Sequence, residues 1–113
     1  MGATLTDSEY QRLTGEVLAK VEATADRLLQ DDVVDIDTHR TGGLLELAFP
    51  GGSKIVINTQ PPLHELWLAA RAGGFHYRYD GQHWVDTKDG SEFFAALTRH
   101  ASAQAGKAVS FSA

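Results

Sequence analysis

Acidic side chains gather in one stretch of the chain and have the chemistry to bind a cation. Glu22 and Asp26 are four residues apart, so on a helix they project from the same face. More aspartates follow within residues 31–37. Carboxylate oxygens are hard ligands that suit Fe²⁺, Fe³⁺, Mn²⁺, Ca²⁺ or Mg²⁺. The alternative is a solvated charged face, which is the commoner use of such runs. We call this set the acidic ridge: Glu22, Asp26, Asp31, Asp32, Asp35 and Asp37.

A second group of side chains has the chemistry of a protein-binding surface. Asn58, Gln60 and Trp67 are amide or large aromatic residues that the core pattern around them does not require. An exposed Trp buries a large area on binding, and amide side chains fix the register of a partner. The alternative is that Trp67 is half-buried within the domain and Asn58 closes a turn, and the residues alone favour neither.

The sequence offers no recognisable catalytic signature, so we expect no catalytic residue and no enzyme activity. The Gly51–Lys54 segment resembles a phosphate-binding loop, but it leads into a strand pattern where that loop needs a helix. The chain has no cysteine, which excludes disulfides, thiolate zinc sites and cysteine-ligated clusters. The histidines form no i, i+4 ligand pair, and we expect surface or structural roles for them. His64 is the best placed to add a metal ligand, because it lies near Trp67 on the strand predicted at residues 64–69. The full set is His39, His64, His76, His83 and His100.

The charge of the chain is unevenly distributed. Residues 1–50 hold ten acids and four bases, a net charge of −6, whereas residues 51–113 hold five acids and six bases, a net of +1. Nucleic acid is therefore not an expected partner, because its phosphates need a basic surface. A cation or a basic protein surface suits the acidic half better. A membrane partner is not expected either, since no apolar run approaches the roughly 20 residues that span a bilayer. The first residues also lack the pattern of a secretory signal.

The first half of the chain begins with a long helix. Thr6 and Glu9 have the spacing of a capping box, and apolar residues then recur on one helical stripe. We predict a helix over residues 7–29, followed by a short edge strand at Val33–Asp37.

Beyond this point the apolar residues alternate, which is typical of strands. We predict strands at 44–49, 53–58, 64–69, 74–79 and 82–87, with Asp80-Gly81 as a hairpin turn. A second helix should start at Asp89–Ser91, and the tail should pack back onto the domain through Val109 and Phe111. This order predicts one α+β domain over residues 1–113, a two-layer sandwich with both helices on one face of a mainly antiparallel sheet. The other face is left open for binding.

One long string of residues resembles a known family. Residues 51–69 read GGSKIVINTQPPLHELWLA, and Gly73–Tyr77, Asp80-Gly81 and Trp84 follow in order. With the closing Ala108–Phe111, this pattern is similar to the frataxin family, and to its bacterial members in particular. The resemblance covers roughly Thr6 to Phe111.

The resemblance implies a cytoplasmic accessory protein of iron–sulfur cluster assembly, which regulates the cysteine desulfurase, supplies iron through the acidic ridge, or does both. It implies that the acidic ridge binds Fe²⁺ or Fe³⁺ weakly at the surface, and that Asn58 and Trp67 face the cysteine desulfurase and the scaffold protein. Relatives commonly carry paired acids where this chain has Glu22-Ala23 and Asp26-Arg27, so we expect a metal affinity below that of the family.

Two other functions stay open. One is a ferroxidase or iron-storage oligomer, which normally needs convergent Glu and His side chains on facing helices. The other is a metal-independent interaction module, in which the acids bind only a protein.

Overall fold

The N-terminal helix forms as its capping pattern predicts. The structure is a computed structural model that describes residues 5–113. The first four residues of the predicted domain, where a secretory signal is not expected, lie outside the described residues. In α1 (Asp7–Gln30), the Thr6 hydroxyl accepts a hydrogen bond from the Glu9 amide at 3.1 Å. The Glu9 carboxylate in turn accepts one from the Thr6 amide at 3.0 Å, which completes the capping box. The buried residues of α1 recur on one stripe that faces the sheet.

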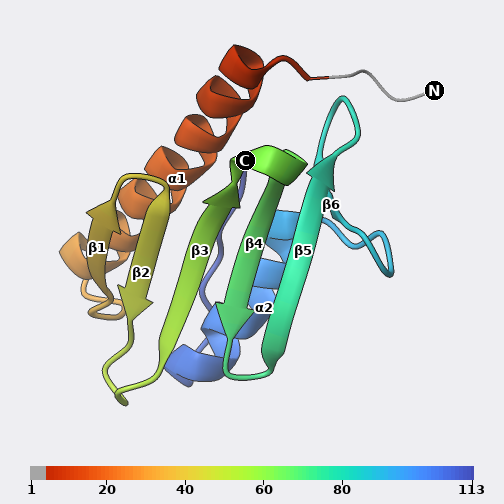
Figure 1. Ribbon diagram of the computed structural model, residues 1–113. Coiled ribbons are helices and arrows are strands. Elements are labelled where there is room, and N and C mark those ends of the chain that lie inside the picture. Colours follow the sequence, from red (N-terminus) through yellow and green to blue (C-terminus); the bar gives the residue numbers. More distant parts are fainter. Residues whose placement is uncertain (1–4) are drawn as a thin grey trace.

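Six antiparallel strands follow and pair in sequence order, β1-β2-β3-β4-β5-β6 (Figure 1). Such a meander keeps every strand beside its neighbour in the chain, so only short connections are needed. The short 3₁₀ helix η1 (Pro61–Leu63) begins with two prolines and joins two of the strands. The strands are β1 (Asp37–Thr41), β2 (Leu44–Ala48), β3 (Lys54–Gln60), β4 (Glu65–Ala70), β5 (Gly73–Tyr79) and β6 (Trp84–Asp86).

The position of the first strand differs from the prediction. Residues 33–36 are not a strand, and the edge strand begins only at Asp37. The amide of Val33 donates to the carbonyl of Leu28 at 2.9 Å, so this segment still completes the end of α1. The predicted strand at Val33–Asp37 is therefore wrong for residues 33–36, because backbone groups of this segment close the end of α1 instead.

The second helix starts later than the prediction. In α2 (Phe93–Ala105) the N-cap is Glu92, whose carboxylate accepts hydrogen bonds from the amides of Phe94 and Ala95 at 2.8 and 3.0 Å. Asp89 instead accepts from Ser91 and closes the turn before the helix. The predicted start of the helix at Asp89–Ser91 is thus a turn closed by Asp89, and the helix itself is capped by Glu92.

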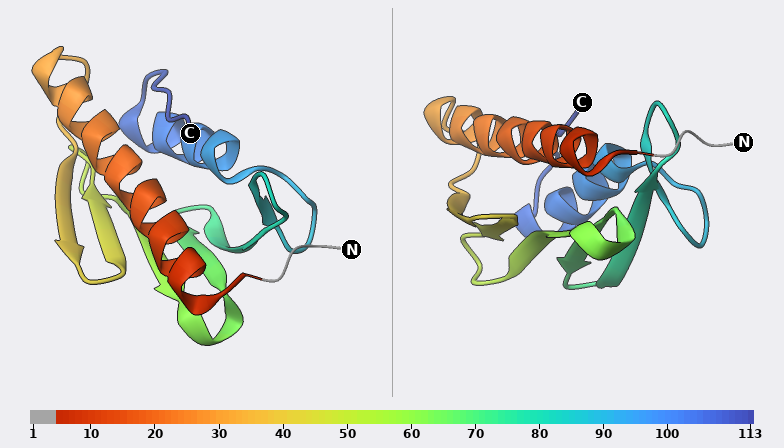
Figure 2. Two further views of the ribbon diagram at one scale, coloured as in Figure 1. Left: turned by 90° about the horizontal axis from the view of Figure 1, so that it is seen from above. Right: turned by 45° about the horizontal axis from the view of Figure 1, so that its top comes forward.

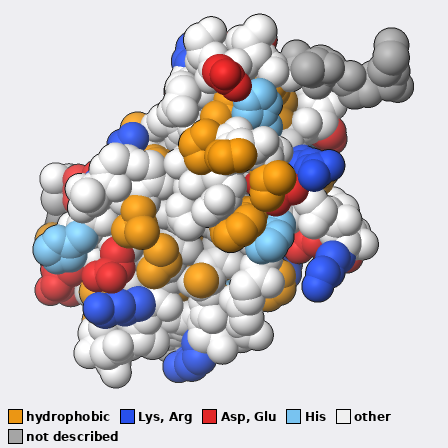
Figure 3. All heavy atoms as spheres, viewed as in Figure 1, with side chains coloured by type: hydrophobic (Ala, Val, Ile, Leu, Met, Phe, Trp, Pro, Cys, Tyr) orange, Lys and Arg blue, Asp and Glu red, His pale blue; other side chains and the backbone are white. Residues whose placement is uncertain are grey.

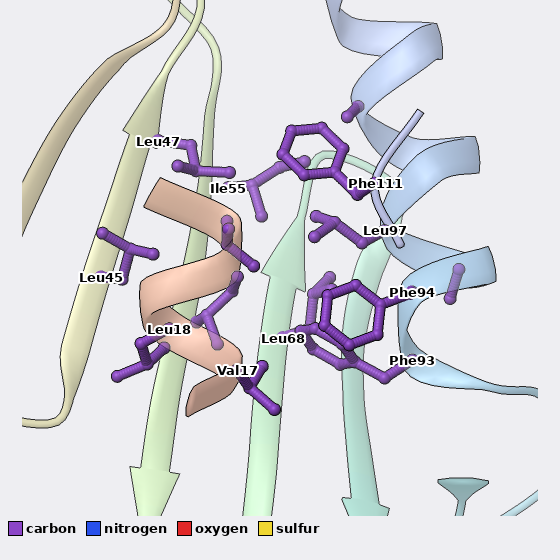
Figure 4. Close-up of a cluster of buried hydrophobic side chains, with 14 of the residues drawn as sticks. Val17, Leu18, Leu45, Leu47, Ile55, Leu68, Phe93, Phe94, Leu97 and Phe111 are labelled. Carbon is purple, nitrogen blue, oxygen red and sulfur yellow. The ribbon is translucent and has the colours of Figure 1, made fainter. Parts of the chain in front are cut away.

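The two helices lie on the same side of the sheet, and the opposite face is open, which confirms the predicted two-layer α+β architecture (Figure 2). Side chains from the sheet, both helices and Phe111 of the tail point toward one another in the core (Figure 4). The hydroxyl of Thr98 accepts from the Phe111 amide at 2.9 Å, which fixes the tail against α2 as expected. Within residues 5–113, no helix has the length and apolar character to cross a membrane.

Candidate functional site

The acidic ridge lies at one edge of the molecule, where the C-terminal half of α1 runs beside β1 (Figure 1). One of its members is already paired with a base. The guanidinium of Arg40, on β1, donates to the carboxylate of Glu22 at 2.8 Å. This pairing is not visible in the sequence, because the two residues are 18 positions apart and meet only where β1 packs on α1. Glu22 is therefore less available to a cation than the remaining acids.

Asp31 and Asp32 lie at the C-terminal end of α1. Asp31 is the C-cap residue, and its amide donates to the Arg27 carbonyl at 2.9 Å. Asp32 follows with a φ of 56°, a left-handed conformation that Asp tolerates better than most residues. The C-terminal end of a helix carries a partial negative charge. Two exposed carboxylates at this end repel it and each other, a repulsion that a bound cation would relieve.

The other ridge residues, Asp26, Asp35 and Asp37, are also exposed. Within residues 5–113, no three His, Asp or Glu side chains lie close enough together to hold a metal ion as a group. The ridge is thus a band of separate carboxylates, on which a cation would keep part of its water shell.

The open face of the sheet brings together the second predicted set. Asn58 on β3 lies directly opposite Trp67 on β4, and Gln60 lies opposite Glu65. Because Leu66 and Leu68 are buried against the helices, Trp67 between them points to the open face. Trp67 is half-buried, as are both amide residues. Each of the two alternatives for Trp67 is therefore partly right: the side chain is half-buried, and it also forms part of the open surface.

The surface around Trp67 is partly apolar. A shallow hollow of about 130 Å³ lies beside the indole and is lined also by Val56, Ala69 and Gly74. Leu44, on β2, is 40% exposed and lies opposite Asn58. Figure 3 shows hydrophobic side chains across the middle of this face, with charged side chains toward both edges. Exposed apolar surface rimmed by charge is typical of a protein-binding site.

Three residues on this face were not predicted from the sequence: Glu65, His76 and Arg78. The Glu65 carboxylate accepts from the indole nitrogen of Trp67 at 2.9 Å and from Nε of Arg78 at 2.8 Å. His76 stacks on Trp67, with ring centroids 4.1 Å apart and planes at 8°. The register of the β4–β5 hairpin pairs Glu65 with Arg78 and Trp67 with His76. The Asp80-Gly81 turn predicts that β5 pairs with its successor, but it says nothing of the register with β4.

Burial alone would raise the pKa of Glu65, but its hydrogen bonds and charged neighbours reverse the direction. The indole of Trp67 and the guanidinium of Arg78 both stabilise the charged carboxylate, and the pKa is lowered from its usual value. Glu65 is therefore ionised at neutral pH although it is buried.

His64 is placed away from this face. It lies just before β4, at the end of η1, with a φ of 50°. Its ring nitrogen lies 2.8 Å from the Asp7 carboxylate, and its ring stacks on Tyr10. His64 thus fastens η1 to the start of α1, and its predicted position on the strand with Trp67 is wrong.

Comparisons with known proteins agree with this fold. Residues 3–107 match a family model described as a frataxin-like domain. The iron–sulfur cluster assembly proteins CyaY of Polaromonas sp. and Variovorax paradoxus are each 50% identical to this chain over 109 residues. These alignments cover 96% of the chain, and 94% and 99% of the two relatives.

Solved structures extend the likeness to the fold. Frataxin from Psychromonas ingrahamii superposes with a TM-score of 0.83 at 33% identity, covering 96% of this chain and all of that one. Trimeric frataxin from the yeast Saccharomyces cerevisiae, crystallised as a ferrous complex, gives a TM-score of 0.71. It is 21% identical and covers 95% of this chain and 92% of that one, so it supports the fold alone. Because the frataxin-like domain and these CyaY relatives each span most of the chain, the protein belongs to the frataxin family.

Proposed function

We propose that this protein is an iron-binding accessory protein of iron–sulfur cluster assembly. The observation that carries the proposal is the open sheet face, where strand register sets Asn58 directly opposite Trp67 on a partly apolar surface. The names of its CyaY relatives point to the same pathway. In this role the open face binds the scaffold protein on which a cluster is built.

The acidic ridge supplies the second part of the proposal. Its exposed carboxylates attract Fe²⁺, and also a basic patch on the cysteine desulfurase. Because Asp31 and Asp32 lie at the negative end of α1, a cation gains from both the carboxylates and the helix end. Separate ligands with retained water make this binding weak, which suits an ion that is passed on or sensed.

A specific observation favours one alternative, a metal-independent interaction module. Glu22 already pairs with Arg40, so part of the ridge is neutralised without metal. In such a module the ridge would bind only the desulfurase, and iron would be incidental.

The test is the anaerobic rate of cluster formation by a cysteine desulfurase and its scaffold, measured with and without this protein over a range of iron concentrations. The ridge variant is Asp31→Asn with Asp32→Asn, since Asn tolerates the left-handed backbone of residue 32. The matched control, Glu16→Gln with Asp7→Asn, removes the same charge from the N-terminal half of α1. Trp67→Ala tests the open face.

We expect the protein to change the rate in an iron-dependent way, and the ridge variant and Trp67→Ala to weaken that change while the control does not. If the ridge variant loses desulfurase binding in metal-free buffer and the rate does not depend on iron, the module is the correct function. In a separate aerobic measurement, sustained oxygen consumption by the protein with iron would instead support a ferroxidase. No effect of the folded protein at any iron level would refute the proposal.

A further inference from the structure

The open face of the sheet buries a carboxylate. The side chain of Glu65 is only 6% exposed, although it points away from the hydrophobic core. Acidic side chains are almost never buried to this extent without partners. Glu65 has such partners, because the side chains of Trp67 and Arg78 both donate to its carboxylate.

The two oxygens of Glu65 divide between two donors. One accepts from the indole nitrogen of Trp67 at 2.9 Å, and the other accepts from Nε of Arg78 at 2.8 Å. Hydrogen bonds to an ionised carboxylate are about twice as strong as neutral ones. The backbone of Glu65 is fixed as well, since its carbonyl accepts from the buried hydroxyl of Tyr10. The carboxylate therefore stands on a rigid part of the sheet.

The Trp67 ring is thereby held in two directions. Its edge is held by Glu65, and its face by the stacked ring of His76. Arg78 is held through Nε, while its side chain stays 63% exposed. A Trp and an Arg on an open sheet would otherwise sample several rotamers. Ordering them before a partner arrives removes an entropic loss from binding.

We propose that Glu65 is a positioning residue, which holds Trp67 and Arg78 in the arrangement that a partner recognises. This inference rests on the proposed function, in which the face around Trp67 binds the scaffold protein. Glu65 itself is covered and contributes through its two neighbours. Its loss should therefore weaken scaffold binding about 5- to 30-fold, the lower part of the range expected when two long side chains are freed, because Trp67 keeps its stacking on His76.

The test variant is Glu65→Leu, which keeps a similar side-chain volume and removes both acceptors. The matched control is Glu46→Leu, which removes a carboxylate on β2 that pairs with Lys54 at 3.5 Å instead. Glu65→Gln is the second variant in case Glu65→Leu does not fold, since an amide offers one acceptor in place of two.

Two readouts separate positioning from plain stabilisation. The first is the indole N–H signal of Trp67 in the NMR spectrum of the free full-length protein, assigned through Trp67→Phe. We expect Glu65→Leu to shift this signal and speed its hydrogen exchange, and Glu46→Leu to leave it unchanged. The second readout is the calorimetric affinity for the scaffold protein. Here we expect a 5- to 30-fold loss for Glu65→Leu, less than twofold for Glu46→Leu, and no further loss when Glu65→Leu is added to Trp67→Ala with Arg78→Ala.

An unchanged indole signal in Glu65→Leu, or an affinity within twofold of the wild type, would overturn the positioning role. If Trp67→Ala weakens binding but neither Glu65 variant does, this inference alone is wrong. If Trp67→Ala leaves the affinity unchanged, the binding face in the proposed function is wrong, and the positioning role for binding falls with it.

Discussion

Replacing Tyr10 with Phe should destabilise the protein far more than the loss of one hydroxyl group suggests. The Tyr10 side chain is 1% exposed and its hydroxyl serves two backbone groups. It donates to the carbonyl of Glu65 and accepts from the amide of Gln60 at 2.9 Å. Gln60 and Glu65 are the last pair of the β3–β4 ladder, so the hydroxyl lies between groups on the two strands where they separate into η1.

The size of the effect follows from these contacts. In Tyr10→Phe both backbone groups lose their partner, and an unpaired buried group costs about 1–3 kcal/mol. The Gln60 end is only partly buried, so water offsets part of its loss. We therefore expect the free energy of unfolding to fall by about 2–3 kcal/mol. For a domain of this size, that lowers Tm by roughly 10 °C or more.

Tyr77→Phe is the matched control, because it deletes the same atom from another fully buried ring. Within the part of the chain that the structure describes, the Tyr77 hydroxyl is buried without a hydrogen-bond partner. Its removal should leave the unfolding free energy unchanged or raise it by up to about 1 kcal/mol. Urea denaturation followed by circular dichroism measures both variants. Equal effects of the two, or a loss below about 0.5 kcal/mol in Tyr10→Phe, would refute the reasoning.

Three further predictions concern pH and charge. Burial, and after it the charge of Asp86, raises the pKa of Tyr77 to about 12, so stability should be full below pH 10 and fall as the pH rises from 10 toward 12. Urea titrations at pH 9 to 11.5 should show this fall, and Tyr77→Phe should reduce it. Burial lowers the pKa of His100, whose Nε2 has no partner among the described residues, so stability should fall as the pH drops below about 6.5. His100→Phe should raise the unfolding free energy by about 1 kcal/mol and flatten the profile between pH 7 and 5, and an unchanged profile would contradict this. Arg40→Gln should free Glu22 and increase Mn²⁺ binding about two- to threefold, seen as paramagnetic broadening of α1 amide signals. The unfolding free energy of Arg40→Gln should change by less than about 1 kcal/mol, because the Glu22–Arg40 pair is partly exposed. Unchanged broadening in this variant would contradict the role of Glu22 in metal binding.

Helices and strands with local signals could be predicted from the amino-acid sequence. The capping box at Thr6 and the apolar stripe predicted α1 to within one residue of its end. Alternating apolar residues predicted the central strands, because a strand with one face in the core alternates apolar and polar side chains. The resemblance to frataxins depended on such a local string, and the family match agrees with it.

The pairing of residues that are distant in the sequence could not be predicted and became visible in the folded chain. The Glu22–Arg40 ion pair and the Glu65 contacts with Trp67 and Arg78 join residues from different elements. The sequence shows an acid at position 65, but its burial depends on how β4 and β5 align and on which side chains then cover it. A buried carboxylate is stable at this position because Trp67 and Arg78 both donate hydrogen bonds to it. No local sequence pattern specifies that these three side chains come together.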